Sequence, residues 1–151
     1  MSIFVSGQNV EGQAGIASGN EQIFSFMSFS SEAIEGSKIT RICSSRTQTF
    51  VLTDDGSVYS AGANDSGELG RSGKRSLFIK LESLEAFVCT DVAVGDGFVI
   101  LILSDGRQIS WGRNEMGQLG LGNRDNREKP KRASILSSIP GELGFIQIAA
   151  G

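Results

Sequence analysis

The chain has 151 residues, enough to bury one sizeable hydrophobic core, and its hydrophobic content of 39% is typical of a globular protein. Its formal net charge of -3 at pH 7 gives no overall basic surface for nucleic acid. The chain contains no histidine and only 2 cysteines, which excludes a Ser/His/Asp triad, a Cys/His pair and a zinc site. We therefore expect no catalytic residues, no metal and no cofactor.

The sequence also lacks recognisable targeting segments. No apolar run approaches the roughly 18 residues of a membrane helix. Residues 1–5 lack the basic region and the long apolar core of a signal peptide. These features predict a cytoplasmic or nuclear protein that does not contact the membrane. In that setting Cys43 and Cys89, which lie in strand-like apolar segments, are expected to be reduced thiols of the core.

A glycine motif, Gly-x-Asn-x-x-Gly-(Gln/Glu)-x-Gly, recurs along the chain at intervals of 55 and 50 residues. Its copies lie at residues 7–15, 62–70 and 112–120. Such self-similarity indicates a solenoid, a propeller or an array. After the first copy, residues 23–30 alternate in polarity, which predicts an outer strand with Phe24 and Phe26 on its buried face.

Strand patterns surround the second copy of the motif. Residues 39–44 form a first predicted strand. Two apolar stretches joined by Asp55-Gly56 follow, and they predict a β-hairpin with a type I′ turn, because both turn residues tolerate a positive φ. Residues 77–81, after the motif, are the predicted outer strand.

The same order of elements surrounds the third copy. Residues 91–95 are a predicted strand, and a second hairpin turns at Asp105-Gly106. Residues 132–136 are the predicted outer strand of this unit, and residues 145–151 begin the first strand of a further unit.

About four short strands in each unit, without helical periodicity, indicate a propeller blade rather than a leucine-rich, ankyrin or tetratricopeptide repeat. The sequence thus predicts one all-β domain, a partial β-propeller over residues 1–151. Its repeat units span roughly residues 1–57, 58–107 and 108–151.

The motif residues are predicted to be structural. Glycines are expected where a strand ends against a neighbouring backbone, where φ is positive and where the chain leaves a tight turn, and each asparagine can lock the turn by bonding nearby backbone. These residues are Gly7, Asn9, Gly12 and Gly15; Gly62, Asn64, Gly67 and Gly70; and Gly112, Asn114, Gly117 and Gly120. A phosphate-binding loop is disfavoured, because no Gly-Lys-Ser/Thr and no helix follow the motif.

The third copy carries a resemblance to a known family. The run from Gly112 to Gly120, preceded by Asp105-Gly106-x-x-Ile109-x-Trp111, resembles the repeat of the Regulator of Chromosome Condensation family. The resemblance implies a β-propeller of seven blades, each a four-stranded antiparallel sheet. This chain is then an incomplete arc of about three such blades. It departs from the family pattern because it lacks the histidine that often precedes the hairpin.

The resemblance implies two main classes of function. The first is a non-catalytic scaffold or regulatory domain that binds proteins through loops, and the alternative is guanine-nucleotide exchange on a small GTPase of the Ran type. Chromatin binding is a weaker third, because residues 1–37 contain no Lys or Arg. The residues expected to contact a partner, if they are more than solvated surface, follow the second and third motifs: Arg71, Lys74, Arg75, Arg124, Arg127 and Lys129.

So short an arc leaves an apolar blade face uncovered at each end, because blades in such an array pack on their neighbours. We expect missing blades, self-association or a protein partner to cover these faces.

Overall fold

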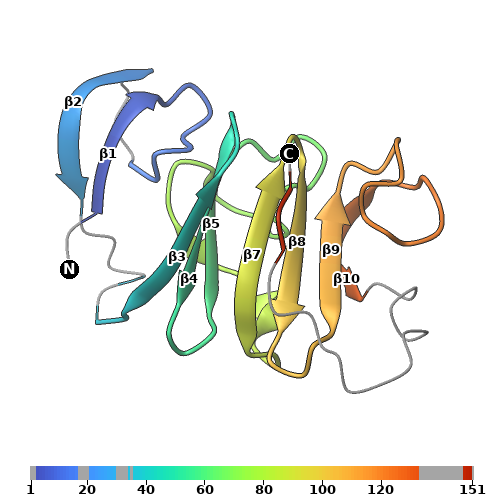
Figure 1. Cartoon of the computed structure of the whole chain (residues 1–151). Coiled ribbons are helices and arrows are strands. Elements are labelled where there is room, and N and C mark those ends of the chain that lie inside the picture. Colours follow the sequence, from blue (N-terminus) through green and yellow to red (C-terminus); the bar gives the residue numbers. More distant parts are fainter. Residues whose placement is uncertain (1–2, 17–20, 30–33, 35, 133–147, 151) are drawn as a thin grey trace.

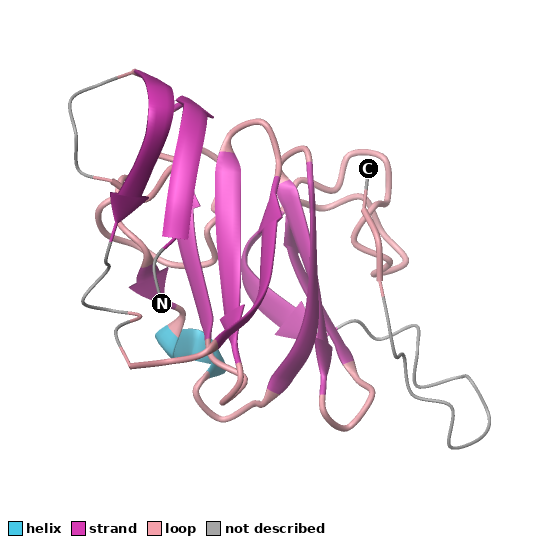
Figure 2. Cartoon of the chain, turned by 60° about the vertical axis from the view of Figure 1, so that its left-hand side comes forward, coloured by secondary structure: helices cyan, strands magenta, loops and turns pink. Residues whose placement is uncertain are grey.

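The structure is a computed structural model that describes residues 3–16, 21–29, 34, 36–132 and 148–150. These residues form ten β-strands and one short 3-10 helix, η1 (Glu82–Leu84). The strands make three antiparallel sheets that follow one another along the chain (Figure 1). Loops gather at the two ends of the strands (Figure 2). No helix of the described part is long and apolar enough to cross a membrane.

The first sheet pairs β1 (Ile3–Gln8) with β2 (Gln22–Phe29). Its buried face carries Ile23, whereas Phe24 and Phe26 are 90% and 77% exposed. The prediction that these two phenylalanines are buried is therefore wrong. Alternation fixes which residues share a face of a strand, but burial needs a neighbouring sheet on that face, and none of the described residues covers this one.

The second and third sheets have four strands each, in the orders β3-β4-β5-β6 and β7-β8-β9-β10. The strands of the second sheet are β3 (Ile39–Ser44), β4 (Gln48–Thr53), β5 (Val58–Gly62) and β6 (Ile79–Lys80). Those of the third are β7 (Cys89–Gly95), β8 (Phe98–Leu103), β9 (Gln108–Gly112) and β10 (Arg127–Arg132). The first strands and the hairpins are thus where the sequence predicts them. Each four-stranded sheet runs across a boundary between sequence units.

The outer strand of the third sheet begins earlier than its sequence pattern suggests. β10 covers Arg127–Arg132 and pairs with β9, whereas residues 133–136 of the predicted strand lie outside the described residues. Charged residues dominate β10, so it lacks the apolar alternation that marks a strand in a sequence. Of the strand predicted at 145–151, only residues 148–150 are described, and they are not assigned to a strand.

The hairpin turns differ from the type I′ prediction, which is wrong. Gly56 N donates to Thr53 O at 3.0 Å, and Thr53 N donates to Ser57 O at 3.0 Å. Glycine alone has a positive φ in these turns, 81° at Gly56 and 77° at Gly106, which is the arrangement of a type I turn followed by a G1 bulge. Asp55 Oδ1 accepts from Thr53 Oγ1 at 2.6 Å and from Ser57 N at 3.0 Å, and these bonds lower the pKa of Asp55.

Two apolar clusters hold the sheets together. The larger lies between the second and third sheets and contains Phe50, Val92, Leu101 and Trp111, all 0% exposed. Cys89 belongs to this cluster, and burial raises the pKa of its thiol to about 11. The smaller cluster comprises Ile34, Val51, Tyr59, Ala61 and Phe78.

Candidate functional site

The three glycine turns, at residues 7–15, 62–70 and 112–120, have one backbone geometry. The φ angles at the last glycine of each turn are 68°, 66° and 65° for Gly15, Gly70 and Gly120. Those at the middle glycines are 77°, 77° and 79°, again in the left-handed region that favours glycine. The three turns therefore have the same shape, although the residues between the shared glycines and asparagines differ.

The motif asparagines make the same hydrogen bond in every turn. The side-chain oxygens of Asn9, Asn64 and Asn114 accept the backbone N–H five residues further on, at 2.9, 2.9 and 3.0 Å. Asn114 also donates through Nδ2 to the carbonyl oxygens of Asn123 and Asp125, at 2.9 and 3.0 Å. Asn64 Nδ2 likewise donates to the carbonyl oxygen of Arg71 at 2.9 Å. The asparagine thus closes the turn and, in the second and third copies, binds the connector that follows it.

The first glycine turn packs directly on the connector that leads to β6 of the second sheet. A Cβ added to Gly12 would lie 2.6 Å from Ser76 Cα, and one added to Gly15 would lie 2.1 Å from the ring of Phe78. Neither position has room for a side chain. Glycine is therefore required here by contact with the next sheet as well as by φ.

The second turn packs on the third sheet in the same way. A Cβ on Gly67 would meet Glu128 Cα at 2.4 Å, and one on Gly70 would meet the ring of Trp111 at 2.9 Å. Trp111 is fully buried, donates from Nε1 to Glu68 O at 2.8 Å, and meets Phe50 edge to face at 6.0 Å between ring centroids. A tryptophan of one sheet thus anchors the turn of the sheet before it.

Arg71 lies inside the connector that follows the second turn. Its guanidinium donates to the Oγ and carbonyl oxygen of Ser60, at 3.0 and 2.5 Å, and to the carbonyl oxygens of Ser72, Lys74 and Leu77, at 3.0 to 3.2 Å. Burial lowers its pKa to about 10. Because its donors bind both the connector's backbone and Ser60 of β5, Arg71 holds this loop in shape against the sheet.

The other basic residues singled out in the sequence lie in different settings. Lys74 and Arg124 are exposed in loops, and the structure gives neither an ion pair among the described residues. Arg75 is ion-paired with Asp65 at 2.7 Å and with Glu11 at 3.8 Å, the latter a contact between the first turn and the second connector.

Arg127 and Lys129 are not loop residues as the sequence suggested, because both lie on β10. Nη2 of Arg127 lies 3.9 Å from Oδ2 of Asp125, an ion pair within this part of the chain. Of these residues, Lys74 and Arg124 are exposed cations in loops, whereas Arg127 and Lys129 belong to a strand.

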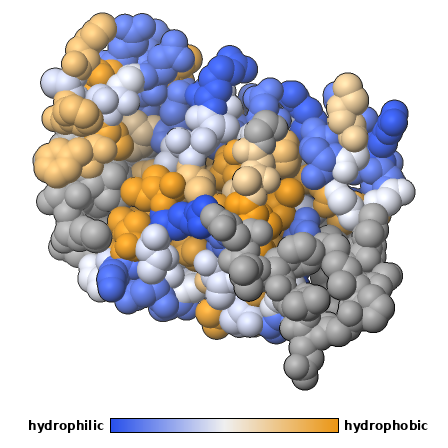
Figure 3. Space-filling model, in the orientation of Figure 1, coloured by the Kyte–Doolittle hydropathy of each residue, from blue (hydrophilic) through white to orange (hydrophobic). Residues whose placement is uncertain are grey.

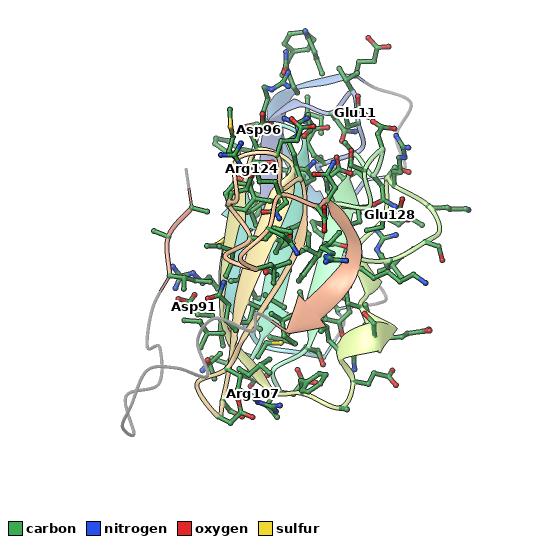
Figure 4. All side chains as sticks on the ribbon, turned by 90° about the vertical axis from the view of Figure 1, so that its right-hand side faces the viewer. Glu11, Asp91, Asp96, Arg107, Arg124 and Glu128 are labelled. Carbon is green, nitrogen blue, oxygen red and sulfur yellow. The ribbon has the colours of Figure 1, made fainter. Side chains whose placement is uncertain are left out.

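Further exposed residues lie at the same end of the sheets and were not singled out in the sequence. Arg46 in the β3–β4 loop is exposed, and Arg113 faces Asp96 at 3.6 Å. Glu11, Asp96 and Arg124 mark this end in Figure 4, with Arg107 at the opposite end. We call this end, which comprises the glycine turns, the connectors after them and the β3–β4 and β7–β8 loops, the turn-side rim. Arg46 was missed because only the fold brings its short loop beside the glycine turns.

A buried carboxylate ties the first strands of successive sheets together. Asp91 on β7 is 2% exposed, and its Oδ1 lies 2.7 Å from Nη1 of Arg41 on β3. Its Oδ2 accepts the backbone N–H of Ile148 at 3.0 Å. Asp91 therefore joins β3, β7 and the end of the described chain. Among the described residues no three or more His, Cys, Asp or Glu side chains form a group that could hold a metal ion.

Successive four-stranded antiparallel sheets, each joined to the next through a glycine turn, define a β-propeller repeat protein. The chain belongs to the Regulator of chromosome condensation (RCC1) repeat family. The model of this repeat matches residues 55–102 and 105–151, and a second RCC1 repeat model matches residues 89–118.

Individual relatives agree with this assignment. The chain is 32% identical over 155 residues to the secretion-regulating guanine nucleotide exchange factor of Bos taurus, a match that covers 99% of this chain and 32% of that protein. It is also 32% identical over 109 residues to the E3 ubiquitin-protein ligase HERC2 of Homo sapiens, covering 70% of this chain and 2% of the ligase. The chain thus spans a third or less of each of these relatives.

Solved structures share the fold. Prp20p of Saccharomyces cerevisiae superposes with a TM-score of 0.84 at 22% identity, covering 99% of this chain and 38% of Prp20p. Human WBSCR16 superposes with a TM-score of 0.75 at 17% identity, with the same coverage of 99% and 38%. At these identities the likeness establishes the β-propeller architecture.

Proposed function

We propose that the chain is a non-catalytic propeller segment that binds a protein partner through its turn-side rim. The observation that carries the proposal is the set of three exposed cations, Arg46, Lys74 and Arg124, for which the structure gives no ion pair among the described residues. They project from loops that the sheets hold in place, and binding residues are disproportionately found on such loops.

The chemistry of the rim favours an acidic protein surface as its partner. Met116 and Val10, at the tips of the third and first turns, are 85% and 60% exposed and add apolar contact area beside the cations. Unpaired surface cations steer an acidic partner and set its orientation, whereas apolar side chains supply binding free energy. Prp20p has been described with its binding properties to Gsp1p and histones, which supports a protein-binding role for this fold. A cytoplasmic or nuclear setting is part of the proposal.

Charge reversal at the rim tests this function. Tagged chains carrying Lys74→Glu or Arg124→Glu are compared with the wild type by quantitative affinity purification and mass spectrometry. Lys38→Glu is the matched control, because Lys38 is an exposed lysine just before β3, at the opposite end of the sheets. Proteins retained by the wild type and by Lys38→Glu but lost from both rim variants are the expected result. Partners lost equally from all three variants, or from none, would place the binding surface elsewhere.

Guanine-nucleotide exchange on a small GTPase of the Ran type is the second candidate. It is supported by the similarity to the bovine guanine nucleotide exchange factor, which extends over 99% of this chain. The test is release of a fluorescent guanine nucleotide from a panel of purified small GTPases, with and without the chain. Accelerated release that Lys74→Glu weakens would support exchange through the rim. Unchanged release from every GTPase would remove this candidate and leave the scaffold role standing.

A further inference from the structure

A small pocket opens at the hairpin end of the sheets, which carries the β4–β5 and β8–β9 turns and lies opposite the turn-side rim. The pocket has a volume of about 120 Å³ and lies between η1 and the third sheet, with Pro130 of β10 as one wall. Its floor is formed by Leu84, Leu103 and Ile109, which are 4%, 3% and 4% exposed. These three residues belong to the larger apolar cluster, so the pocket reaches the core between the second and third sheets.

The mouth of the pocket is formed by Ser83, Phe87 and Arg107. Ser83 is exposed, whereas Phe87 and Arg107 are half-buried. Cζ of Arg107 lies 5.6 Å from the centroid of the Phe87 ring, and the guanidinium is ion-paired with Asp105. Figure 4 shows Arg107 at this end of the molecule. Because Asp105 offsets the charge of Arg107, the mouth carries no net charge of its own.

The size and the lining of the pocket suit one aliphatic side chain. A cavity of about 150 Å³ lined by Leu, Ile and Phe is large enough for benzene, so a slightly smaller apolar space accommodates a branched side chain such as that of leucine. Pockets that receive a single apolar side chain commonly anchor the binding of a protein segment.

Two carboxylates without an opposing charge lie beside the mouth. Glu82 and Glu85 flank Ser83 and Leu84 along the chain, and Glu85 N donates to Glu82 O at 3.1 Å. Side chains three residues apart in a 3-10 helix eclipse one another, so both carboxylates lie on the same side of η1. Both are exposed, and the structure gives neither an ion pair among the described residues. Their mutual repulsion would be relieved by a cation bound between them.

The other charged side chains that the structure describes at this end each have an opposite charge close by. They are Lys38 beside Asp54, Lys80 beside Asp55, and Arg107 beside Asp105. Figure 3 shows hydrophilic side chains among apolar ones along the lower edge of the view, which is the hairpin end. The surplus of negative charge therefore lies on η1, next to the pocket.

We propose that this pocket binds a short basic segment of a partner protein, with one aliphatic side chain in the pocket and an adjacent Lys or Arg beside Glu82 and Glu85. The apolar floor supplies the anchor, and the two carboxylates select a cationic neighbour for it. This surface is separate from the turn-side rim and has the opposite charge, so the proposal does not depend on the function assigned to the rim.

Defined peptides and two variants of the pocket test the proposal with the full chain. The probe is a fluorescent peptide with a central leucine between lysines, compared with the same peptide carrying alanine for leucine or glutamates for the lysines. Ser83→Trp places an indole in the mouth, and Ser104→Trp is its control, because Ser104 is exposed at the same end but does not line the pocket. Glu82→Gln/Glu85→Gln removes the carboxylates. Glu21→Gln/Glu115→Gln changes the net charge equally at exposed sites away from the hairpin end.

Binding is measured by fluorescence anisotropy and located by amide shifts in NMR spectra, which also establish that every variant is folded. We expect the leucine peptide to shift the amides of Ser83, Phe87 and Arg107, and the alanine peptide to bind about tenfold more weakly or less. Ser83→Trp should abolish binding, and Glu82→Gln/Glu85→Gln should weaken it about three- to tenfold and reduce its salt dependence, whereas both controls bind as the wild type does.

Equal affinity for the leucine and alanine peptides would overturn the assignment of the pocket, as would undiminished binding by Ser83→Trp. Equal affinity for the lysine and glutamate peptides would overturn the choice of a basic segment. Absence of binding by every peptide, together with loss of stability in Ser83→Trp but not in Ser104→Trp, would show that the pocket serves only the packing of the chain itself.

Discussion

Alanine at the last glycine of each turn separates the cost of the backbone from the cost of packing between sheets. Gly15, Gly70 and Gly120 have φ angles of 68°, 66° and 65°, so each Ala variant loses about the same 1–2 kcal/mol for holding an L-residue in the left-handed region. Only the first two also force a Cβ into an occupied space, at 2.1 Å from Phe78 and 2.9 Å from Trp111.

Overpacking of this kind costs roughly 1–3 kcal/mol. We therefore expect Gly15→Ala and Gly70→Ala to lose about 2–5 kcal/mol of unfolding free energy, and Gly120→Ala about 1–2 kcal/mol. The difference between the variants is the cost of forcing a Cβ into the contact between sheets, because the backbone term is shared.

The three variants are compared by urea unfolding, followed by circular dichroism. Fluorescence of Trp111, the chain's 1 tryptophan, provides a second probe at the interface and should change in Gly70→Ala but not in Gly120→Ala. Equal losses of stability in Gly70→Ala and Gly120→Ala would refute the reasoning, since the packing term would then be absent.

Three further outcomes follow from buried or hydrogen-bonded groups. Asp91→Asn removes the charge beside Arg41 and should cost about 1–3 kcal/mol in urea unfolding, less than for a fully buried pair because Arg41 is partly exposed; unchanged stability would contradict this. Thr53→Val should raise the pKa of Asp55 toward its ordinary value in an NMR titration, because Thr53 is the largest cause of the lowered pKa. Because the folded-state pKa of Asp55 is lowered, its ionised form stabilises the fold at pH values above the ordinary pKa of 3.8, and this stability is lost as the pH falls through the folded-state pKa. The loss of stability in acid should therefore be smaller in Thr53→Val. Cys89, with a pKa of about 11, should resist a thiol reagent at mildly alkaline pH until urea is added, and rapid labelling at Cys89 in the folded chain, located by peptide mass mapping because Cys43 is also a free thiol, would contradict its burial.

The sequence predicts the strands well where polarity alternates or where an Asp-Gly pair joins two apolar stretches. It places the start of β10 five residues too late, because the sequence Arg-Glu-Lys-Pro-Lys-Arg has no apolar residue other than Pro130. It also assigns the wrong hairpin turn at Asp55-Gly56, because the pair is compatible with both a two-residue and a three-residue loop. Distinguishing them requires the register of the flanking strands, which the structure supplies through the bond from Gly56 N to Thr53 O.

Side-chain environment was harder to predict than strand position. Arg71 and Lys74 lie three residues apart in one polar segment, yet Arg71 donates three hydrogen bonds to the connector's backbone and two to Ser60 of β5, whereas Lys74 is exposed. Phe26 on β2 and Phe78 just before β6 are both apolar, but of the two only Phe78 is covered by residues that the structure describes. In both pairs the burial of the side chain depends on its neighbours in the fold, and local composition does not reveal which neighbours it will have.

The glycine motif shows why a repeat identifies architecture more readily than interfaces. A positive φ alone requires glycine at Gly120, where an added Cβ would find open space, and the same requirement holds at Gly15, where it would strike a ring. The motif consequently recurs whether or not a neighbour is present. What differs between the copies is the aromatic residue that meets the turn: Phe78, Trp111, or none among the described residues. Residues outside the glycine motif therefore decide how each turn is packed against the sheet that follows it.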